Sequence, residues 1–201
     1  MPPSPSTGRR ASVPPIDPTA YAPTPQRPLR AKVRTLAAAT RVDPHSHPWA
    51  QVAMSGTGVI RMTAGRSTYI VPPSRAVWIP PGVEHVVTVL EDAQIRTLYV
   101  HPDAAWLADE PPQGSVWQVC RVLEVSNLLR ELVGHLDGDA GTGPADERER
   151  CLAHLVLDEL KRAAPVRLGV DLPADKRLRA LCEAVLDDPV RWATLEQWAA
   201  Q

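Results

Sequence analysis

The sequence predicts a mixed β plus α fold, with an antiparallel β-barrel or sandwich first and amphipathic helices after it. Three observations lead to this prediction. Residues 29–100 contain short runs rich in Val, Ile, Thr, Tyr and Trp, and Gly, Pro or Asp separates these runs at close intervals. No helical pattern lies between them, so hairpins are expected rather than a doubly wound sheet. After His101 the pattern changes to apolar residues at helical spacing.

Residues 1–28 are expected to be a disordered, Pro-rich tail. The chain has 22 prolines, six tryptophans and no phenylalanine, and many of the prolines fall in this segment. A segment with almost no bulky aliphatic residues cannot bury enough apolar surface to offset the entropy lost on ordering. Arg9, Arg10 and Arg27 outnumber its one acid, Asp17. A solvated tail without function is the simpler interpretation, and weak attraction to nucleic acid is the alternative.

Residues 29–105 are expected to form the β domain. The strand-like runs are AKVRTLAAAT, AQVAMSGTGVIRMTA, RSTYIVPP, RAVWIPP, HVVTVLED and AQIRTLYVH. Ala64-Gly65-Arg66 predicts a hairpin turn, and Pro80-Pro81-Gly82 predicts a second tight turn. Strands this short, joined directly to one another, are typical of a closed barrel or a sandwich.

Residues 106–114 are expected to be a connector, because they contain two adjacent prolines and a glycine. Residues 115–165 are expected to be helical, with one amphipathic helix at 115–137 and a second at 145–164. The second run is acidic at its start and basic at its end, as the helix dipole favours. Two such apolar faces must be buried against the barrel, against each other or against a partner's copies.

Residues 171–201 predict a third helical section that begins near Pro173 and stops at Asp187-Asp188-Pro189. Thr194 and Gln197 have the spacing of a capping box, which predicts the start of one more helix. A helix of about two turns is too short to be stable alone. We therefore expect that the natural protein or its ancestor continued beyond Gln201.

Charge, hydropathy and cysteine spacing narrow the class of protein. The formal net charge of -1 gives no reason to expect non-specific affinity for nucleic acid or anionic membrane, so any DNA contact would have to be local. The chain has no apolar run of about 18 residues and no apolar signal core, which predicts a soluble cytoplasmic protein. Cys120, Cys151 and Cys182 lack the spacing of zinc or redox motifs and are expected to be reduced thiols.

The candidate ligand-binding group consists of His45, His47, Gln51 and His85. Residues two apart in a strand point to the same face, and His85 follows the Pro-Gly turn, so the strands can bring these side chains to one point. Imidazoles and an amide oxygen suit a divalent first-row transition metal ion. We expect the site to take either such an ion or a small organic ligand, with the histidines hydrogen-bonded to backbone in the second case.

The candidate lining of an organic-ligand pocket is Trp49, Tyr69, Trp78 and Glu84. The three aromatic side chains can form a wall for a flat ligand in the mouth of the barrel. A plain core position is the alternative for Trp78, which lies in the apolar run VWIP. Nothing marks any of the nearby acids as catalytic except the position of Glu84 beside His85, so we expect no catalytic residues and no enzyme activity.

The histidine pattern resembles that of cupins, whose barrels are RmlC-like jelly rolls. The cupin pattern reads His-x-His-x3-Glu, then Gly, then Pro-x-Gly-x2-His, and the matching residues here are His45, His47, Gln51, Gly58, Pro80, Gly82 and His85. Gln51 stands where metal-dependent cupins have glutamate, which removes an anionic ligand. The longer run HSHPWAQVAMSGTGVIRMTAGRSTYIVPPSRAVWIPPGVEHVV resembles the sensor domain of AraC-family transcriptional regulators, and LPADKRLRALCEAVLDDPVRWATLEQWAA resembles the start of their DNA-binding domain.

The resemblance implies a cupin sensor at 29–105, a dimerisation segment at 115–165 and the truncated start of a helix-turn-helix domain at 171–201. It also implies a homodimer through helices 115–137 and 145–164, a small-molecule or metal effector, and operator DNA for a full-length form. The sequence ends before the first recognition helix, so its DNA-binding residues are unknown and this chain is not expected to bind its operator specifically. The alternatives are a stand-alone metal-dependent cupin enzyme of the oxygenase or isomerase type, and a partner that heterodimerises with full-length relatives.

Overall fold

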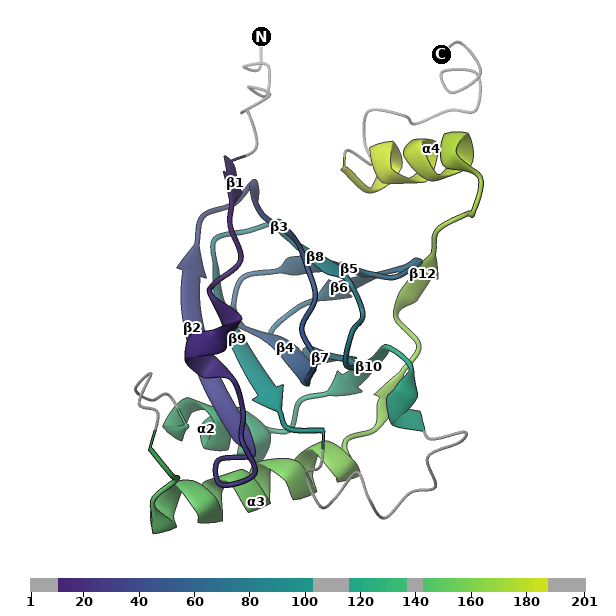
Figure 1. The fold of residues 1–201 in the computed structure, drawn as a ribbon. Coiled ribbons are helices and arrows are strands. Elements are labelled where there is room, and N and C mark those ends of the chain that lie inside the picture. Colours follow the sequence, from purple (N-terminus) through teal and green to yellow (C-terminus); the bar gives the residue numbers. More distant parts are fainter. Residues whose placement is uncertain (1–10, 103–115, 137–142, 188–201) are drawn as a thin grey trace, which may run out of the picture.

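Two six-stranded sheets lie face to face, and helices cover one of them (Figure 1). The computed structural model describes residues 11–102, 116–136 and 143–187. The outer sheet has the order β1-β3-β8-β5-β6-β12 and the central sheet the order β11-β10-β7-β4-β9-β2. Neighbouring strands are antiparallel except β1 and β3. This arrangement confirms the predicted mixed fold with an antiparallel cupin-type barrel.

The elements follow in chain order. They are β1 (Ala11–Val13), the 3-10 helix η1 (Pro18–Tyr21), β2 (Leu29–Leu36), β3 (Thr40–His45), β4 (Ala50–Thr57), β5 (Ile60–Ala64), β6 (Ser67–Val71), β7 (Arg75–Ile79), β8 (His85–Val89), β9 (Ala93–Val100), the 3-10 helix η2 (Val116–Gln118), β10 (Arg121–Glu124), α2 (Asn127–His135), α3 (Glu147–Arg162), β11 (Pro165–Val166), β12 (Gly169–Asp171) and α4 (Lys176–Asp187).

The central sheet is buried on both faces. Alternate residues of each strand point to opposite sides, so each strand contributes to both layers of the core. On β4, Val52 and Met54 join the cluster shared with α2 and α3, whereas Ala53 joins the cluster between the two sheets. The outer sheet has one core face, to which Ile60 and Met62 of β5 contribute. The core therefore has two layers, and the central sheet lies between them.

Glycines allow two of the tight turns. Gly65 has φ of +59° in the predicted hairpin between β5 and β6, where Ala64 pairs with Ser67. Gly58 has φ of +69°, and a Cβ there would lie 2.2 Å from the backbone oxygen of Asp92. Only glycine accommodates both the left-handed backbone and this close approach.

Helices α2 and α3 pack on the central sheet. The Ser126 side chain caps α2 by accepting a hydrogen bond from the Leu129 backbone N–H at 2.9 Å, and the Asp146 side chain caps α3 by accepting from Glu149 at 2.7 Å. Their apolar faces meet the sheet through side chains such as Leu129 and Val156, both almost completely buried. The predicted helix at 145–164 thus corresponds to α3, and its apolar face is buried within the chain.

The single helix predicted at 115–137 is wrong in its first half. Residues 116–124 form η2 and β10, and only Asn127–His135 is α-helical. Strand β10 pairs with β7, so that Val122 lies opposite Val77 and Leu123 opposite Ala76. Because both faces of the central sheet are covered, consecutive apolar residues in β10 are all buried, and such a run has the same apolar density as a helix face.

The predicted disorder of residues 1–28 is also wrong for residues 11–28, and residues 1–10 lie outside the described ranges. Strand β1 pairs with β3, the Lys32 ammonium lies 3.8 Å from the centre of the Tyr21 ring, and Arg27 forms an ion pair with Glu149. Contacts with distant parts of the chain, rather than local apolar content, order this segment. Composition alone does not reveal such contacts.

The C-terminal part crosses from one sheet to the other before α4. Strand β11 pairs with β10 in the central sheet, and β12 pairs with β6 in the outer sheet. Helix α4 agrees with the helix predicted to begin near Pro173, and the Asp175 side chain caps its first turn. The predicted connector at 106–114 and the helix start at Thr194 lie outside the described residues. Within the described part of the chain, every helix is too short or too polar to cross a membrane.

Candidate functional site

Three histidine rings gather at one end of the space between the sheets. His45 ends β3 and lies opposite His85, the first residue of β8, while His47 belongs to the loop before β4. The ring centres of His45 and His85 are 4.2 Å apart, those of His47 and His85 are 5.3 Å apart, and those of His45 and His47 are 6.4 Å apart. The structure therefore brings together the histidines that the sequence pattern singled out.

Backbone carbonyls hold all three rings through their Nδ1 atoms. Nδ1 of His45 lies 2.8 Å from the Asp43 carbonyl oxygen, Nδ1 of His47 lies 2.7 Å from that of Trp49, and Nδ1 of His85 lies 3.0 Å from that of Val83. A carbonyl oxygen only accepts hydrogen bonds, so each Nδ1 carries the proton and donates it. In a neutral ring the Nε2 atom is then left as an acceptor with a free lone pair.

Gln51 occupies the Nε2 atom of His47. Its side-chain oxygen position lies 2.9 Å from this atom. Because Nδ1 of His47 already donates to Trp49, a neutral His47 is satisfied when Gln51 turns its amide NH₂ toward Nε2 and donates. Glutamate, which the cupin pattern has at this position, cannot donate when ionised. Gln51 therefore changes the hydrogen bonding of His47 as well as the charge of the site.

Burial favours the neutral forms of the remaining rings. It lowers the pKa of His85 to about 4, and it lowers the pKa of His45 below its ordinary value. Burial also raises the pKa of Tyr99 to about 12, so its hydroxyl stays protonated. His45, His85 and Tyr99 are thus uncharged hydrogen-bonding groups at neutral pH.

Two buried polar atoms in this region lack hydrogen-bond partners among the described residues. They are Nε2 of His85, whose residue is 1% exposed, and Nε1 of Trp49. The Trp49 ring stacks on the ring of His47 with centres 5.3 Å apart. An unsatisfied buried acceptor and an unsatisfied buried donor are both costly, which makes this region a strong candidate for a ligand that pairs with them.

A small cavity of about 40 Å³ lies beside the histidines, inside the barrel. Gln51, His45, Thr97, Tyr99 and Arg34 are among the residues that line it, together with Ile16 from the segment between β1 and η1. One Arg34 guanidinium nitrogen donates a hydrogen bond to the Pro14 carbonyl oxygen at 3.1 Å. The N-terminal segment therefore forms part of the wall of this cavity, whose space is about that of one or two water molecules.

The other predicted pocket residues do not lie together. Trp49 lies beside His47, but Trp78 points to the opposite face of the central sheet, where its indole N–H donates to the Trp117 carbonyl oxygen at 2.8 Å. Trp78 is therefore a core residue, as the alternative held, and it does not line the cavity. Tyr69 is buried with Met62 between the sheets next to β12, and Glu84 is exposed.

Sequence reasoning missed Tyr99 and Arg34. Tyr99 lies directly opposite Gln51, and its ring meets that of His47 edge-on with centres 5.3 Å apart. The alternation along β9, in which Leu98 and Val100 face the helices, was the signal available for Tyr99. For Arg34, no such signal existed, because an arginine on an edge strand is normally expected in solvent.

The histidine group does not have the arrangement of a preformed metal site. Among the residues that the structure describes, no three His, Cys, Asp or Glu side chains are arranged to hold a metal ion. The imidazole nitrogens are suitable donors, but Gln51 occupies the one on His47, and the set contributes no negative charge. A metal ion would require Gln51 to release His47.

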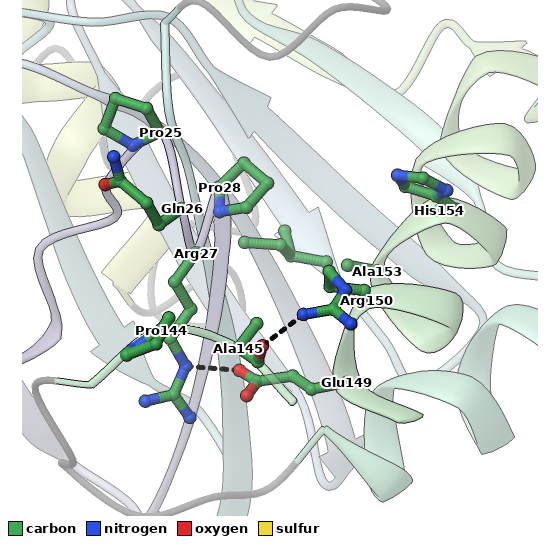
Figure 2. Close-up of a pocket in the computed structure, with 11 residues that line it drawn as sticks. Pro25, Gln26, Arg27, Pro28, Pro144, Ala145, Glu149, Arg150, Ala153 and His154 are labelled. Atoms are coloured by element: carbon green, nitrogen blue, oxygen red, sulfur yellow. Dashed lines mark hydrogen bonds and ion pairs between the residues drawn. The ribbon is translucent and has the colours of Figure 1, made fainter. Parts of the chain in front are cut away.

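A larger cavity of about 370 Å³ lies outside the barrel, between residues 25–29 and α3 (Figure 2). Arg27 and Glu149 form an ion pair across it, and Arg150 donates to the Ala145 carbonyl oxygen at 2.8 Å. These polar groups are already paired with one another. The cavity therefore lacks the unsatisfied buried atoms that distinguish the histidine site.

Comparison with known proteins shows the family to which the chain belongs. Residues 32–157, more than half of the chain, match the family described as AraC-like ligand binding domain. HTH-type transcriptional regulator NimR from Escherichia coli (strain K12) is 31% identical over 155 residues, which is 77% of this chain and 54% of that regulator. The chain therefore spans about half the length of this relative.

Two solved structures show a weaker likeness. KdgF from Halomonas sp. is 22% identical with a TM-score of 0.36, over 39% of this chain and 73% of that one. A cupin-2 domain containing protein from Shewanella frigidimarina is 18% identical with a TM-score of 0.33, over 36% of this chain and 71% of that one.

Proposed function

Because this chain belongs to the family of AraC-like ligand binding domains, we propose that it is the effector-sensing and dimerisation region of a transcriptional regulator. One observation carries the proposal: the matched residues 32–157 contain the buried histidine site, helix α2 and helix α3 up to Leu157. Binding of a small molecule between the sheets and association through the helices are the two activities assigned to the region. For the whole regulator we propose operator DNA as the partner. We also propose a cytoplasmic location, because the operator lies there.

The proposed effector is a small polar molecule with a hydrogen-bond donor and an acidic group. The donor pairs with Nε2 of His85, which accepts because Nδ1 carries the proton. The acidic group pairs with the guanidinium of Arg34, which lines the small cavity together with His45, whose ring lies beside that of His85. Since about 40 Å³ is too small for such a molecule, the segment that contains Pro14 and Ile16 has to move aside when the effector enters.

A thermal-shift and calorimetric screen tests this effector class. Small hydroxycarboxylates are compared with the matching amides, on the wild-type chain and on Arg34→Gln and His85→Phe variants. Each variant is expected to weaken binding of a compound found in the screen roughly tenfold or more. Arg34→Gln loses a hydrogen bond to a charged group, and His85→Phe loses a buried hydrogen bond. Arg66→Gln, at an exposed arginine of the β5–β6 turn, serves as the control. Equal binding of acids and amides would contradict the role of Arg34.

A divalent transition metal ion as the effector is the second candidate, and the three converging imidazoles favour it. His45, His47 and His85 would hold the ion through Nε2 atoms that their Nδ1 hydrogen bonds orient, with Gln51 turned away or bound through its oxygen. Metal analysis of the purified chain beside His45→Ala and His85→Ala variants separates the candidates. Equal, low metal content in all three proteins would rule out the ion.

A stand-alone cupin enzyme is not proposed. The only acid near the histidines that the sequence suggested for a chemical step, Glu84, is exposed. A general acid or base has to reach the reacting group in the pocket, and Glu84 does not line the described cavity. Ligand binding without chemistry accounts for the neutral, buried donor and acceptor set.

A further inference from the structure

The face of the outer sheet that points away from the core carries buried polar side chains. Thr68 is 3% exposed, Thr88 is 6% exposed and Arg61 is 8% exposed. The alternation along β5 and β8 places their neighbours Met62 and Val87 in the core, so these polar residues lie on the opposite side. Such a face is normally in contact with water. The burial of these three side chains indicates that another part of the protein covers the middle of this face, whereas Arg41 toward its edge is exposed.

The pairing register arranges the polar groups in rows. Arg41 of β3 lies opposite Thr88 of β8, and Thr88 lies opposite Arg61 of β5, so two guanidinium groups flank a hydroxyl. In the adjacent row Thr63 and Thr68 are opposite each other, and their hydroxyl oxygens are 3.0 Å apart. Two cations and several hydroxyl donors on one surface are suited to a carboxylate.

Helix α4 provides such a carboxylate. A cavity of about 100 Å³ over this face is lined by the arginines and threonines of the two rows and, from α4, by Glu183 and Leu186. The glutamate is the only acid in the lining of this cavity as described. Glu183 and Leu186 are three residues apart and lie on the same side of the helix.

The chain that leads into α4 is fixed to the same sheet. Strand β12 pairs with β6, the Leu172 backbone N–H donates to the Arg66 carbonyl oxygen at 2.7 Å, and the Leu172 side chain is 1% exposed. Only a few residues separate this anchor from Lys176, the start of α4. A tether this short keeps the helix at high local concentration near the sheet, so even a weak contact holds the helix on the sheet in many of the molecules.

We propose that the outer face of the outer sheet is a docking surface for helix α4, and that Glu183 is recognised by Arg41 and Arg61. A free anion is a poorer occupant, because Glu183 on the rim repels it. The docking surface joins the sensor barrel to the segment that leads out of it. Its existence does not depend on the identity of the effector or on DNA binding.

Hydrogen exchange of residues 176–187 in the 201-residue chain tests the docking. An isolated helix of this length is marginal in water, so slow exchange there requires contact with the sheet. Glu183→Lys replaces attraction by repulsion and is expected to speed exchange in α4 roughly fivefold, with a similar effect from Arg41→Glu. The double variant Arg41→Glu with Glu183→Arg is expected to restore slow exchange. Glu91→Lys, at an exposed acid of the β8–β9 turn, is the control.

Further readouts distinguish docking from the alternatives. Raising the sodium chloride concentration is expected to speed exchange in wild-type α4 and to have little effect in Glu183→Lys, since salt screens exposed charges. Unprotected α4 in the wild type, or identical exchange in all variants, would overturn the proposal. So would protection of Arg41 and Thr88 amides by millimolar phosphate without release of α4, because the cavity would then be an anion site. Effector binding to the barrel can fail independently of each of these results.

Discussion

At the scale of single residues, the backbone decides what the histidine site can bind. The three Nδ1 atoms are tied to carbonyl oxygens, so each neutral ring presents an acceptor at Nε2. Gln51 then satisfies His47 and leaves His85 unsatisfied. One amide in place of a carboxylate therefore favours a donor-bearing organic ligand over a metal ion.

The substitution Gln51→Glu tests this residue. An ionised glutamate adds a negative ligand and no longer donates to His47, so the variant is expected to hold more Mn, Ni or Zn than the wild type after purification. The affinity gain is expected to be roughly tenfold or more, measured by elemental analysis and metal titration. Gln94→Glu, on the other face of the central sheet, is the control. No gain in metal content would show that the site cannot assemble around an ion.

The lowered pKa of His85 makes the free energy of unfolding depend on pH. Its pKa is about 4 in the fold against 6.5 in an unfolded chain, so the unfolded state binds more protons between these values. The contribution to stability is full above pH 6.5 and is lost as the pH falls toward 4, by about 3 kcal/mol at most. Urea unfolding across this range is expected to show a flatter dependence for His85→Gln than for the wild type. His154→Gln, at an exposed histidine of α3, is expected to keep the wild-type slope.

At the scale of elements, alternation and turn residues predicted much of the barrel. The runs between residues 29 and 100 correspond to β2 through β9, and Gly65 forms the expected hairpin turn. The pattern failed where both faces of a strand are buried. Strand β10 was predicted as helix, and Trp78 as a possible pocket residue, because an apolar residue on the central sheet does not reveal which layer it enters.

We predict that the outer faces of helices α2 and α3 form the dimer surface. Their inner faces are buried on the sheet, and Leu128 and Leu155 remain 52% and 50% exposed. Leu155→Asp is expected to weaken dimerisation at least tenfold, because a leucine buried in an interface contributes about 1.5–3 kcal/mol. Light scattering after gel filtration, over a dilution series, measures the change. Leu90→Asp, at a leucine 40% exposed in the β8–β9 turn, is expected to leave the oligomeric state unchanged.

At the scale of the whole molecule, contacts between distant segments decide what composition could not. The N-terminal segment looks disordered by its prolines, yet it touches β3, lines the histidine cavity and reaches α3 through Arg27. The same limitation applies to the site. The histidines were predictable from their spacing, whereas Arg34 and Ile16 enter the cavity only because of how this segment folds back.

Deletion of residues 1–22 tests the importance of this segment. The truncated chain loses the β1–β3 pairing and the cover that Ile16 gives the cavity, but it keeps Arg27. Faster hydrogen exchange is expected at Thr40–Val42, together with a lower melting temperature. Exchange in α3 is expected to stay unchanged, which separates local uncovering from general loss of the fold. Unchanged exchange in β3 would show that β1 does not contribute to the edge of the sheet.

The double burial of the central sheet has a mechanical consequence. On β4, Gln51 touches the histidine site while Val52, the next residue, packs under the helices; on β9 the same holds for Tyr99 and Val100. One peptide plane separates the two environments, so a rotation of the strand backbone that moves one side chain also moves its neighbour. A ligand that twists β4 at Gln51 or β9 at Tyr99 would therefore also move the residues on which α2 and α3 pack, without a separate relay of side chains.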